Sequence, residues 1–492
     1  MNLQGDILEN LVAMESAGTQ YPGGWYNPSE KYPEYLWGDT EIAEDDNLVY
    51  DAIRKCLYGL GLDRENFGKA VWNPLGEIIN KGDTVLLKPN LVVSDHPNLE
   101  CIVTNPAIVR AVLDFVCIAL QGTGRIIVGD APMQRCNFGE LIDKTGYDRV
   151  IDFFRKRNIE IEFIDFRNFV SDYSSESVKI LRNCHADSNN FVAVDLKKES
   201  LHCSRDRFYK RYRVTNYDYR RMREYHNPQH HIYLIRKEIL EADVVINLPK
   251  PKTHRKAGFT GALKNVVGTV VHKECLPHHI RGSVETGGDE YLKKDFFKCW
   301  RTFCYEQIDL ANIYDKKTFL FILKKMLSFT DKAVGKFKRD PFSEGSWYGN
   351  DTIWRTFVDI NRCLMYSDKK GALQEKKQRK FLTIADMIIA GEKDGPVHAS
   401  PKNVGLLMVG TNPVAVDFLI AQVMGFDYKK IPALSGIMSS MTKPLWYGDR
   451  KDVKVVSSSF GGEEKQLDEV SCCFEFVPTN GWKGNIEMEN YR

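Results

Sequence analysis

Five short stretches of the chain are almost wholly apolar and predict buried strands. They are "TVLLKP" (84–89), "GRIIVGD" (124–130), "IEIEFIDF" (159–166), "DVVINLP" (243–249) and "VGLLMVG" (404–410). Most of them run apolar without alternation, as do strands of a parallel sheet that is covered on both faces. The pattern therefore predicts a mainly parallel sheet with helices packed against its two sides.

Helical patterns fall between or after several of these strands. In 104–120, apolar residues recur at three- and four-residue steps, and the opening Thr-Asn-Pro offers an N-cap and a first-turn proline. Residues 411–425 open with the same three residues and end at Gly425, which suits a C-terminal cap. This alternation of strands and helices indicates the α/β class.

The chain has 492 residues, which is enough for more than one packed unit. We expect a core in two halves, with a helical insertion between them and a terminal hairpin whose strands are "DVKVVSSS" and "SCCFEFVP". The expected divisions are an N-terminal extension (1–80), a first α/β core (81–291), a helical insertion (292–380), a second α/β core segment (381–440) and a C-terminal β-hairpin (441–492).

The overall charge gives no general reason for binding nucleic acid or acidic membranes, because 68 Lys and Arg face 66 Asp and Glu. No apolar run approaches the roughly 20 residues that a membrane span needs. The first residues lack the basic flank of a secretory signal. Twelve scattered cysteines suggest reduced thiols. We therefore expect a cytoplasmic globular protein without a membrane span.

One basic segment, residues 204–226, interleaves eight Lys or Arg with five tyrosines. RNA-binding strands have this kind of composition. The simpler interpretation is a hairpin with one aromatic and one cationic face. Because the whole chain is nearly neutral and has no recognised nucleic-acid motif, we do not expect nucleic acid as a partner.

The strongest chemical signal is the loop "NLPKPKTHRKAGFTGALKNVVG" (247–268). It follows a predicted strand, and open α/β sheets bind ligands at the carboxyl ends of their strands. Lys250, Lys252, His254 and Lys256 supply positive charge and one group that titrates near neutrality. Gly258 and Gly261 allow close backbone approach. The mixture suits a loop that binds an anion; a solvated basic loop with glycines for its turns is the alternative.

Several segments together resemble the family catalogued as domain of unknown function 362. They are "LLKPNLV" (86–92), "TNPAIVRAV" (104–112), "GDAP" (129–132), "ADVVINLPKPKTH" (242–254), "TGALKNVVG" (260–268) and the stretch 391–425. The family is largely uncharacterised, so the resemblance names no reaction. Some members carry an adjoining ferredoxin-type module, which implies a separate ferredoxin-type partner here. This chain has no Cys-x-x-Cys-x-x-Cys run, so we expect no iron–sulfur cluster within it.

A second resemblance is to the nickel-pincer lactate racemases, in which a histidine precedes a glycine-rich motif and its cofactor-bearing lysine. Here His254 precedes Lys264 by ten residues, and His278 and His279 follow Lys264 by 14 and 15. The resemblance implies Lys264 as the attachment point, His254 as a proton-transfer base and His278 or His279 as a nickel ligand. Ala262-Leu263 replaces the family's Gly-x, and its earlier His-Arg pair is not found.

The same loop also allows a site without a cofactor, in which lysines and backbone N–H groups cradle phosphate or carboxylate. His254 would be an acid or base, and Lys264 a nucleophile or base. Our candidate catalytic residues are His254 and Lys264. Our candidate anion-binding residues are Lys88, Asn90, Lys250, Lys252, Thr253, Gly258, Gly261 and Asn265.

Carboxylates near strand ends offer ligands for a hard divalent cation such as Mg²⁺. The candidate metal ligands, counting both the nickel and the magnesium alternatives, are His278, His279, Asp130 and Glu392. Asp130 suits a turn or cap equally well. The doublets Cys184-His185 and His202-Cys203 could bind zinc, but adjacent residues on a strand point to opposite faces, so we do not expect a site there.

Two classes of function remain open. The first is an enzyme that binds a small anion and carries out isomerisation or redox chemistry at a hydroxy-acid or sugar-acid carbon. The second is a metal or cofactor carrier, or an electron-transfer protein, without turnover of its own. Motifs of P-loop ATPases, nicotinamide dehydrogenases, α/β-hydrolases and His-Glu-x-x-His proteases are absent, which disfavours those classes.

Overall fold

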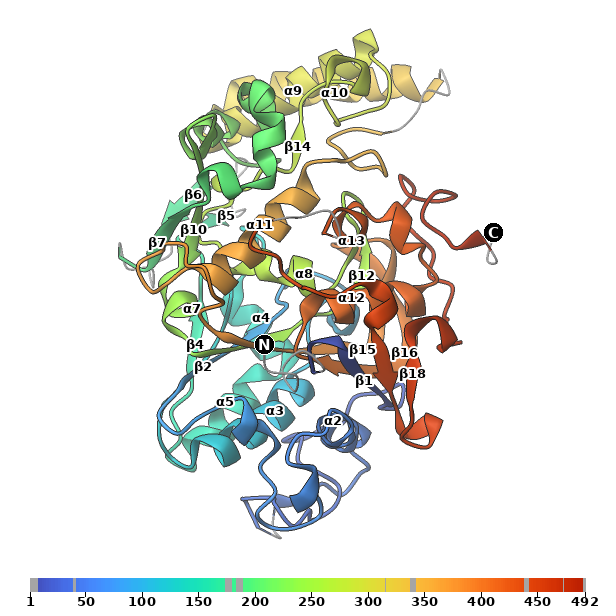
Figure 1. The fold of residues 1–492 in the computed structure, drawn as a ribbon. Coiled ribbons are helices and arrows are strands. Elements are labelled where there is room, and N and C mark those ends of the chain that lie inside the picture. The colour runs from blue at the N-terminus through green and yellow to red at the C-terminus, as the bar shows by residue number, and fades with distance from the viewer. Residues whose placement is uncertain are drawn as a thin grey trace.

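The computed structural model describes residues 8–38, 41–172, 179–182, 189–314, 316–336, 342–437, 442–471 and 473–489. Within them, one large mixed sheet has the strand order β18-β17-β1-β16-β15-β11-β2-β3-β4, with β12 paired to β15 and β13 paired to β12 (Figure 1). Its strands are β1 (Leu11–Ser16), β2 (Thr84–Pro89), β3 (Arg125–Asp130), β4 (Glu162–Asp165), β11 (Val244–Leu248), β12 (Lys252–His254), β13 (Gly258–Thr260), β15 (Lys380–Asp394), β16 (His398–Gly410), β17 (Lys454–Val456) and β18 (Glu464–Gln466).

The α/β class and all five predicted strands are confirmed. β15, β11, β2, β3 and β4 pair in parallel, so both expected core segments contribute to one sheet. The stretch 404–410 is an exception to the parallel pattern, because it ends β16, which is antiparallel to β15 and β1. β1 comes from the expected N-terminal extension and pairs inside the sheet.

Two hydrophobic clusters cover the two faces of the sheet. Successive residues of a strand alternate between them: Val85 faces one cluster and Leu86 the other. The helices α2 (Leu48–Gly59) and α3 (Pro106–Leu120) contribute to one cluster, while α11 (Ile353–Tyr366) and α12 (Pro413–Met424) contribute to the other. Burial on both faces explains why most predicted strands are apolar without alternation.

The two Thr-Asn-Pro openings begin helices as predicted. The Asn105 side chain accepts a hydrogen bond from the Ala107 N–H at 2.9 Å, and the Asn412 side chain accepts one from the Val414 N–H at 2.9 Å. Each asparagine therefore caps the helix that follows it. Gly425 ends α12 with a φ of 77°, in the left-handed region that favours glycine.

Other helices lie around this core. α9 (Phe296–Ile313) and α10 (Lys317–Lys336), from the expected helical insertion, lie beyond one end of the sheet (Figure 1), whereas α11 from the same stretch packs in the core. The remaining α-helices are α4 (Phe138–Thr145), α5 (Tyr147–Arg155), α6 (Met222–Tyr225), α7 (Lys237–Glu241), α8 (Ala262–Asn265) and α13 (Pro432–Ile437). In the described ranges, no helix is long and apolar enough to cross a membrane.

Smaller sheets lie outside the main one. They are formed by β5 (Phe169–Asp172) with β6 (Lys179–Arg182), by β7 (Phe191–Asp195) with β10 (His230–Arg236) and β9 (His226–Asn227), and by β8 (Tyr212–Arg213) with β14 (His279–Ile280).

Two local predictions need correction. Residues 204–226 do not form a hairpin: a 3₁₀ helix, η6 (Leu201–Arg211), leads into β8 and then α6. The strand residues of this segment find their partner elsewhere, because β8 is antiparallel to β14 and not to a second strand within 204–226. The C-terminal hairpin is present as the antiparallel pair β17 and β18, but residues 473–478, expected as its second strand, are irregular.

Candidate functional site

A cavity of about 780 Å³ opens at the carboxyl ends of β2, β3 and β11. Residues 90–92, 130–135 and the loop after β11 line it, together with 214–217 and 394–398 from other parts of the chain. Parallel neighbouring strands place the segments that follow them at one edge of the sheet, which is where α/β proteins bind ligands. The position predicted for the site is therefore where this cavity lies.

Seven of the residues expected from the sequence line this cavity. They are Asn90, Asp130, Lys252, His254, Lys264, Asn265 and His278. Lys256, expected as one of the loop's positive charges but not as a candidate ligand, also lines it, and so does Lys273. Lys273 follows the loop and has no sequence signal that distinguishes it.

Lys264 is a lysine without a partner among the described residues, and it is partly exposed to the cavity. Its helix, α8, begins where the Asp417 carboxylate accepts hydrogen bonds from the Ala262 and Leu263 N–H groups, at 2.5 and 3.0 Å. A Cβ on Gly261 would lie 2.1 Å from Asp417 Oδ1, so this approach requires glycine. Burial, with the charges of neighbouring lysines, lowers the pKa of Lys264 to about 7.

Lys256 and Lys273 add two more positive groups to the wall. Burial lowers the pKa of each to about 8. Lys273 Nζ donates to the Ala131 carbonyl at 3.0 Å, and Lys256 Nζ lies 3.5 Å from Thr215 Oγ1. Neither contact is with a carboxylate, so the lysines retain charge that an anionic ligand could neutralise.

Three histidines line the cavity: His254, His278 and the exposed His398. The first two carry their protons on different nitrogens. His254 Nδ1 accepts from the Lys256 and Ala257 N–H groups, at 3.0 and 3.2 Å, so Nε2 bears the hydrogen of the neutral ring. His278 Nδ1 lies 2.7 Å from the Leu276 carbonyl and must donate to it, which leaves a lone pair on Nε2. Burial lowers both pKa values well below 6.5, so both rings are neutral. His254 and His278 thus offer one imidazole donor and one imidazole acceptor.

Lys88 and Asp130 form a buried ion pair beneath this edge, with Nζ and Oδ1 2.7 Å apart. Asp130 also accepts from the Leu91 N–H at 2.6 Å. Asn265 donates to the Lys88 carbonyl at 3.0 Å and to Asn247 Oδ1 at 2.8 Å. This network positions the strand ends, and it neutralises Lys88, which does not line the cavity.

The other expected residues lie outside the cavity lining. Lys250 pairs with Asp386 at 3.1 Å, Thr253 donates to the Lys393 carbonyl at 2.8 Å, and Glu392 accepts from the Val477 N–H at 3.0 Å. Gly258, with a φ of 80°, packs against Trp482 and Ile486, and His279 lies in β14. These residues contribute to the structure around the loop.

The four expected metal ligands do not gather into one set. In the described part of the chain, a single group brings three ligand atoms close together, and it lies elsewhere: Cys203, Asp206 and His231. Cys184 and His185, weighed as zinc ligands, lie outside the described residues. Of the expected metal ligands, His278 and Asp130 line the cavity, and Nε2 of neutral His278 keeps a lone pair.

The fold and site together define an α/β protein with a lysine- and histidine-lined cavity at the strand ends. The sequence matches the family described as Domain of unknown function (DUF362) over residues 85–186 and 184–422, and the chain belongs to this family. The family match gives no support to the resemblance to nickel-pincer lactate racemases.

Two further similarities were found. The chain is 23% identical over 363 residues to the thylakoid-associated protein sll1697 of Synechocystis sp., covering 73% of this chain and 69% of that protein. A crystal structure of a Thermotoga maritima protein aligns at 13% identity and a TM-score of 0.30, covering 77% of this chain and 57% of that one.

Proposed function

We propose that the protein is an enzyme that binds a small carboxylate or phosphate anion in this cavity and transfers protons at the neighbouring carbon. The observation that carries the proposal is Lys264, which has no partner among the residues that the structure describes and lies with Lys256 and Lys273 in the wall of a cavity of about 780 Å³. Burying three cations together is unfavourable without a counter-charge. An anionic substrate supplies that charge.

The two histidines suit acid–base catalysis on such a substrate. His278 Nε2 can accept a proton, and His254 Nε2–H can donate one or polarise a carbonyl, as neutral imidazoles do in isomerases. With the carboxylate on Lys264, removal and return of a proton at the adjacent carbon would isomerise a hydroxy acid or sugar acid. This assigns substrate binding to Lys264 and proton transfer to the histidine pair.

Redox chemistry at the same carbon is the second candidate, and Lys264 is the observation that favours it. A lysine with a pKa of about 7 is partly unprotonated at neutral pH and can form a covalent bond to a cofactor. A nickel-pincer group attached there would supply a hydride acceptor, with His278 available as a ligand. A carrier without turnover would use the same lysine. We place either activity in the cytoplasm.

The first test is calorimetric titration with oxalate, a small dianion that keeps its charge between pH 6 and 9, combined with metal analysis of protein from its own host. The proposal predicts oxalate binding that Lys264→Met abolishes and Lys81→Met, an exposed lysine, leaves intact. Equal binding by all three proteins would refute it. About one nickel per chain, lost in Lys264→Met, would instead support the cofactor candidate.

A second test separates the enzyme from the carrier. Racemisation and oxidation of lactate and related hydroxy acids are measured for the wild type and for His278→Gln. An enzyme predicts that turnover is lost while oxalate affinity is kept. Stoichiometric metal with no turnover on any acid tested would favour the carrier.

A further inference from the structure

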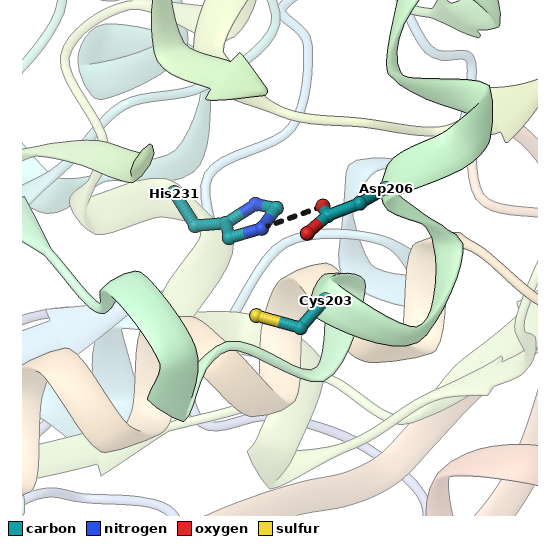
Figure 2. Close-up of side chains that lie close together, drawn as sticks. All are labelled: Cys203, Asp206 and His231. Carbon is teal, nitrogen blue, oxygen red and sulfur yellow. Dashed lines mark ion pairs between the residues drawn. The ribbon is translucent and has the colours of Figure 1, made fainter. Parts of the chain in front are cut away.

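Cys203, Asp206 and His231 bring a sulfur, a carboxylate oxygen and an imidazole nitrogen together, all within 4.8 Å of one another. Figure 2 shows the imidazole and the carboxylate facing each other, with the thiol beside them. Cys203 and Asp206 belong to η6, and His231 belongs to β10. None of the three lines the cavity described above.

The local structure explains this meeting. A 3₁₀ helix has three residues per turn, so side chains three positions apart lie on the same side. Cys203 and Asp206 have this spacing in η6. His231 is held opposite them by β10, which pairs with β7 and β9, and its N–H donates to Asp195 Oδ1 at 2.9 Å.

Counting hydrogens shows that a positive charge is needed at this point. A row of three contacts runs from a carbonyl to a carboxylate: His226 Nε2 to Cys275 O at 2.9 Å, His226 Nδ1 to His231 Nδ1 at 3.2 Å, and His231 Nε2 to Asp206 Oδ1 at 3.0 Å. Each contact needs one hydrogen, but two neutral imidazoles carry only two. Whichever way the hydrogens are arranged, one contact joins two lone pairs.

The missing charge is either a third proton or a metal ion. The His226 ring donates to Cys275 O, so His231 Nδ1 donates to His226, and the bare lone pair falls on His231 Nε2. That nitrogen is fully buried, and the polar atom that it meets is Asp206 Oδ1, at 3.0 Å. It faces Asp206, and the Cys203 sulfur lies beside the same point. The Cys203 thiol would have no role in an ion pair between His231 and Asp206, but as a thiolate it would be a third ligand for a metal ion.

We propose that Cys203, Asp206 and His231 bind a Zn²⁺ ion, with the fourth coordination position open to water or a ligand. Sulfur, nitrogen and carboxylate oxygen are the ligand types of zinc in proteins, and three protein ligands with one open position are typical of catalytic sites. Cys203 and Asp206 are partly exposed, so the ion can reach the site from solvent.

The surroundings support ligation by these atoms. Metal-binding histidines almost always donate their other N–H to a fixed acceptor, and His226 Nδ1 is that acceptor for His231. The Cys203 thiol lies 3.1 Å from the Lys197 carbonyl and would release its proton on binding. The ion would join η6 to β10 and make the stability of this region depend on metal.

The test is titration of the metal-free full chain with Zn²⁺ by calorimetry and with Co²⁺ by absorption. We expect one equivalent to bind and Co²⁺ to show the near-ultraviolet charge-transfer band of a thiolate ligand. Cys203→Ser should abolish the band, and His231→Gln should weaken binding. His226→Gln, which removes only the acceptor behind His231, should weaken it about 10- to 100-fold. Cys299→Ser, another partly exposed free cysteine, is the matched control and should change nothing.

Circular dichroism of the metal-free variants checks that each one folds. Two results would overturn the proposal: no uptake of either ion by the wild type, or an unchanged cobalt band in a folded Cys203→Ser. A third result would overturn it as well: nitrogen NMR that shows His231 as a doubly protonated imidazolium in protein supplied with Zn²⁺. The missing positive charge would then be a proton and not a metal ion.

Discussion

Replacing Lys264 by methionine should stabilise the protein while it removes anion binding. The folded state holds the pKa of Lys264 at about 7, whereas the unfolded chain restores it to 10.5. The folded state therefore binds this proton more weakly than the unfolded state does. Stability is lost as pH falls through that range and regained as pH rises from about 7 to 10.5.

The size of the effect follows from the shift. A pKa difference from 10.5 to about 7 corresponds to about 4 kcal/mol of destabilisation at pH 7 as an upper limit. Part of the Lys264 side chain is exposed to the cavity, so solvent screening reduces this, and we expect about 2 kcal/mol. Methionine has a similar length and no charge, so Lys264→Met should gain about that much stability.

Urea unfolding at several pH values measures this. Lys264→Met should have a higher midpoint than the wild type at pH 7, and the difference should shrink toward pH 10. Lys81→Met, at an exposed position, should stay within about 0.5 kcal/mol of the wild type. If Lys264→Met were destabilised at pH 7, the ammonium would have a partner in the folded state and the proposed anion site would lose its basis.

Three other changes test the site. His278→Gln removes the Nε2 acceptor and should reduce turnover about 10²- to 10⁴-fold, with oxalate affinity kept; an equal loss of affinity would contradict its role. Gly268→Ala places a Cβ 1.8 Å from Asp130 Oδ1 and should cost about 1–3 kcal/mol in urea unfolding; an unchanged midpoint would argue against this packing. Burial raises the pKa of Asp417 from 3.8 to about 7, so the stability that its protonated form contributes is lost as pH rises between those values. Asp417→Asn should therefore flatten the plot of unfolding free energy against pH in that range, and an unchanged plot would refute the shift.

Local patterns in the sequence determined much of the core. A strand buried on both faces must be apolar throughout, so the five strands could be identified from the sequence. Asparagine followed by proline caps a helix through atoms within two residues, so the starts of α3 and α12 were also predictable. The position of the loop after β11 followed from the same rules, because ligands bind where parallel strands end.

The tertiary structure decided which residues face the cavity and in what state. Lys250 and Lys252 lie two residues apart, yet Lys250 pairs with Asp386, far along the chain, while Lys252 lines the cavity. The pKa of Lys264 and the tautomers of His254 and His278 depend on burial and on backbone partners, which sequence spacing does not specify.

The same limit explains the site at Cys203. The sequence shows only His202 beside Cys203, and strand geometry would have separated them. The structure makes this segment a 3₁₀ helix, which aligns Cys203 with Asp206, and β10 brings His231 to both from a different part of the chain. Short-range rules determine which elements form, but contacts between residues distant in sequence arise only from how those elements pack.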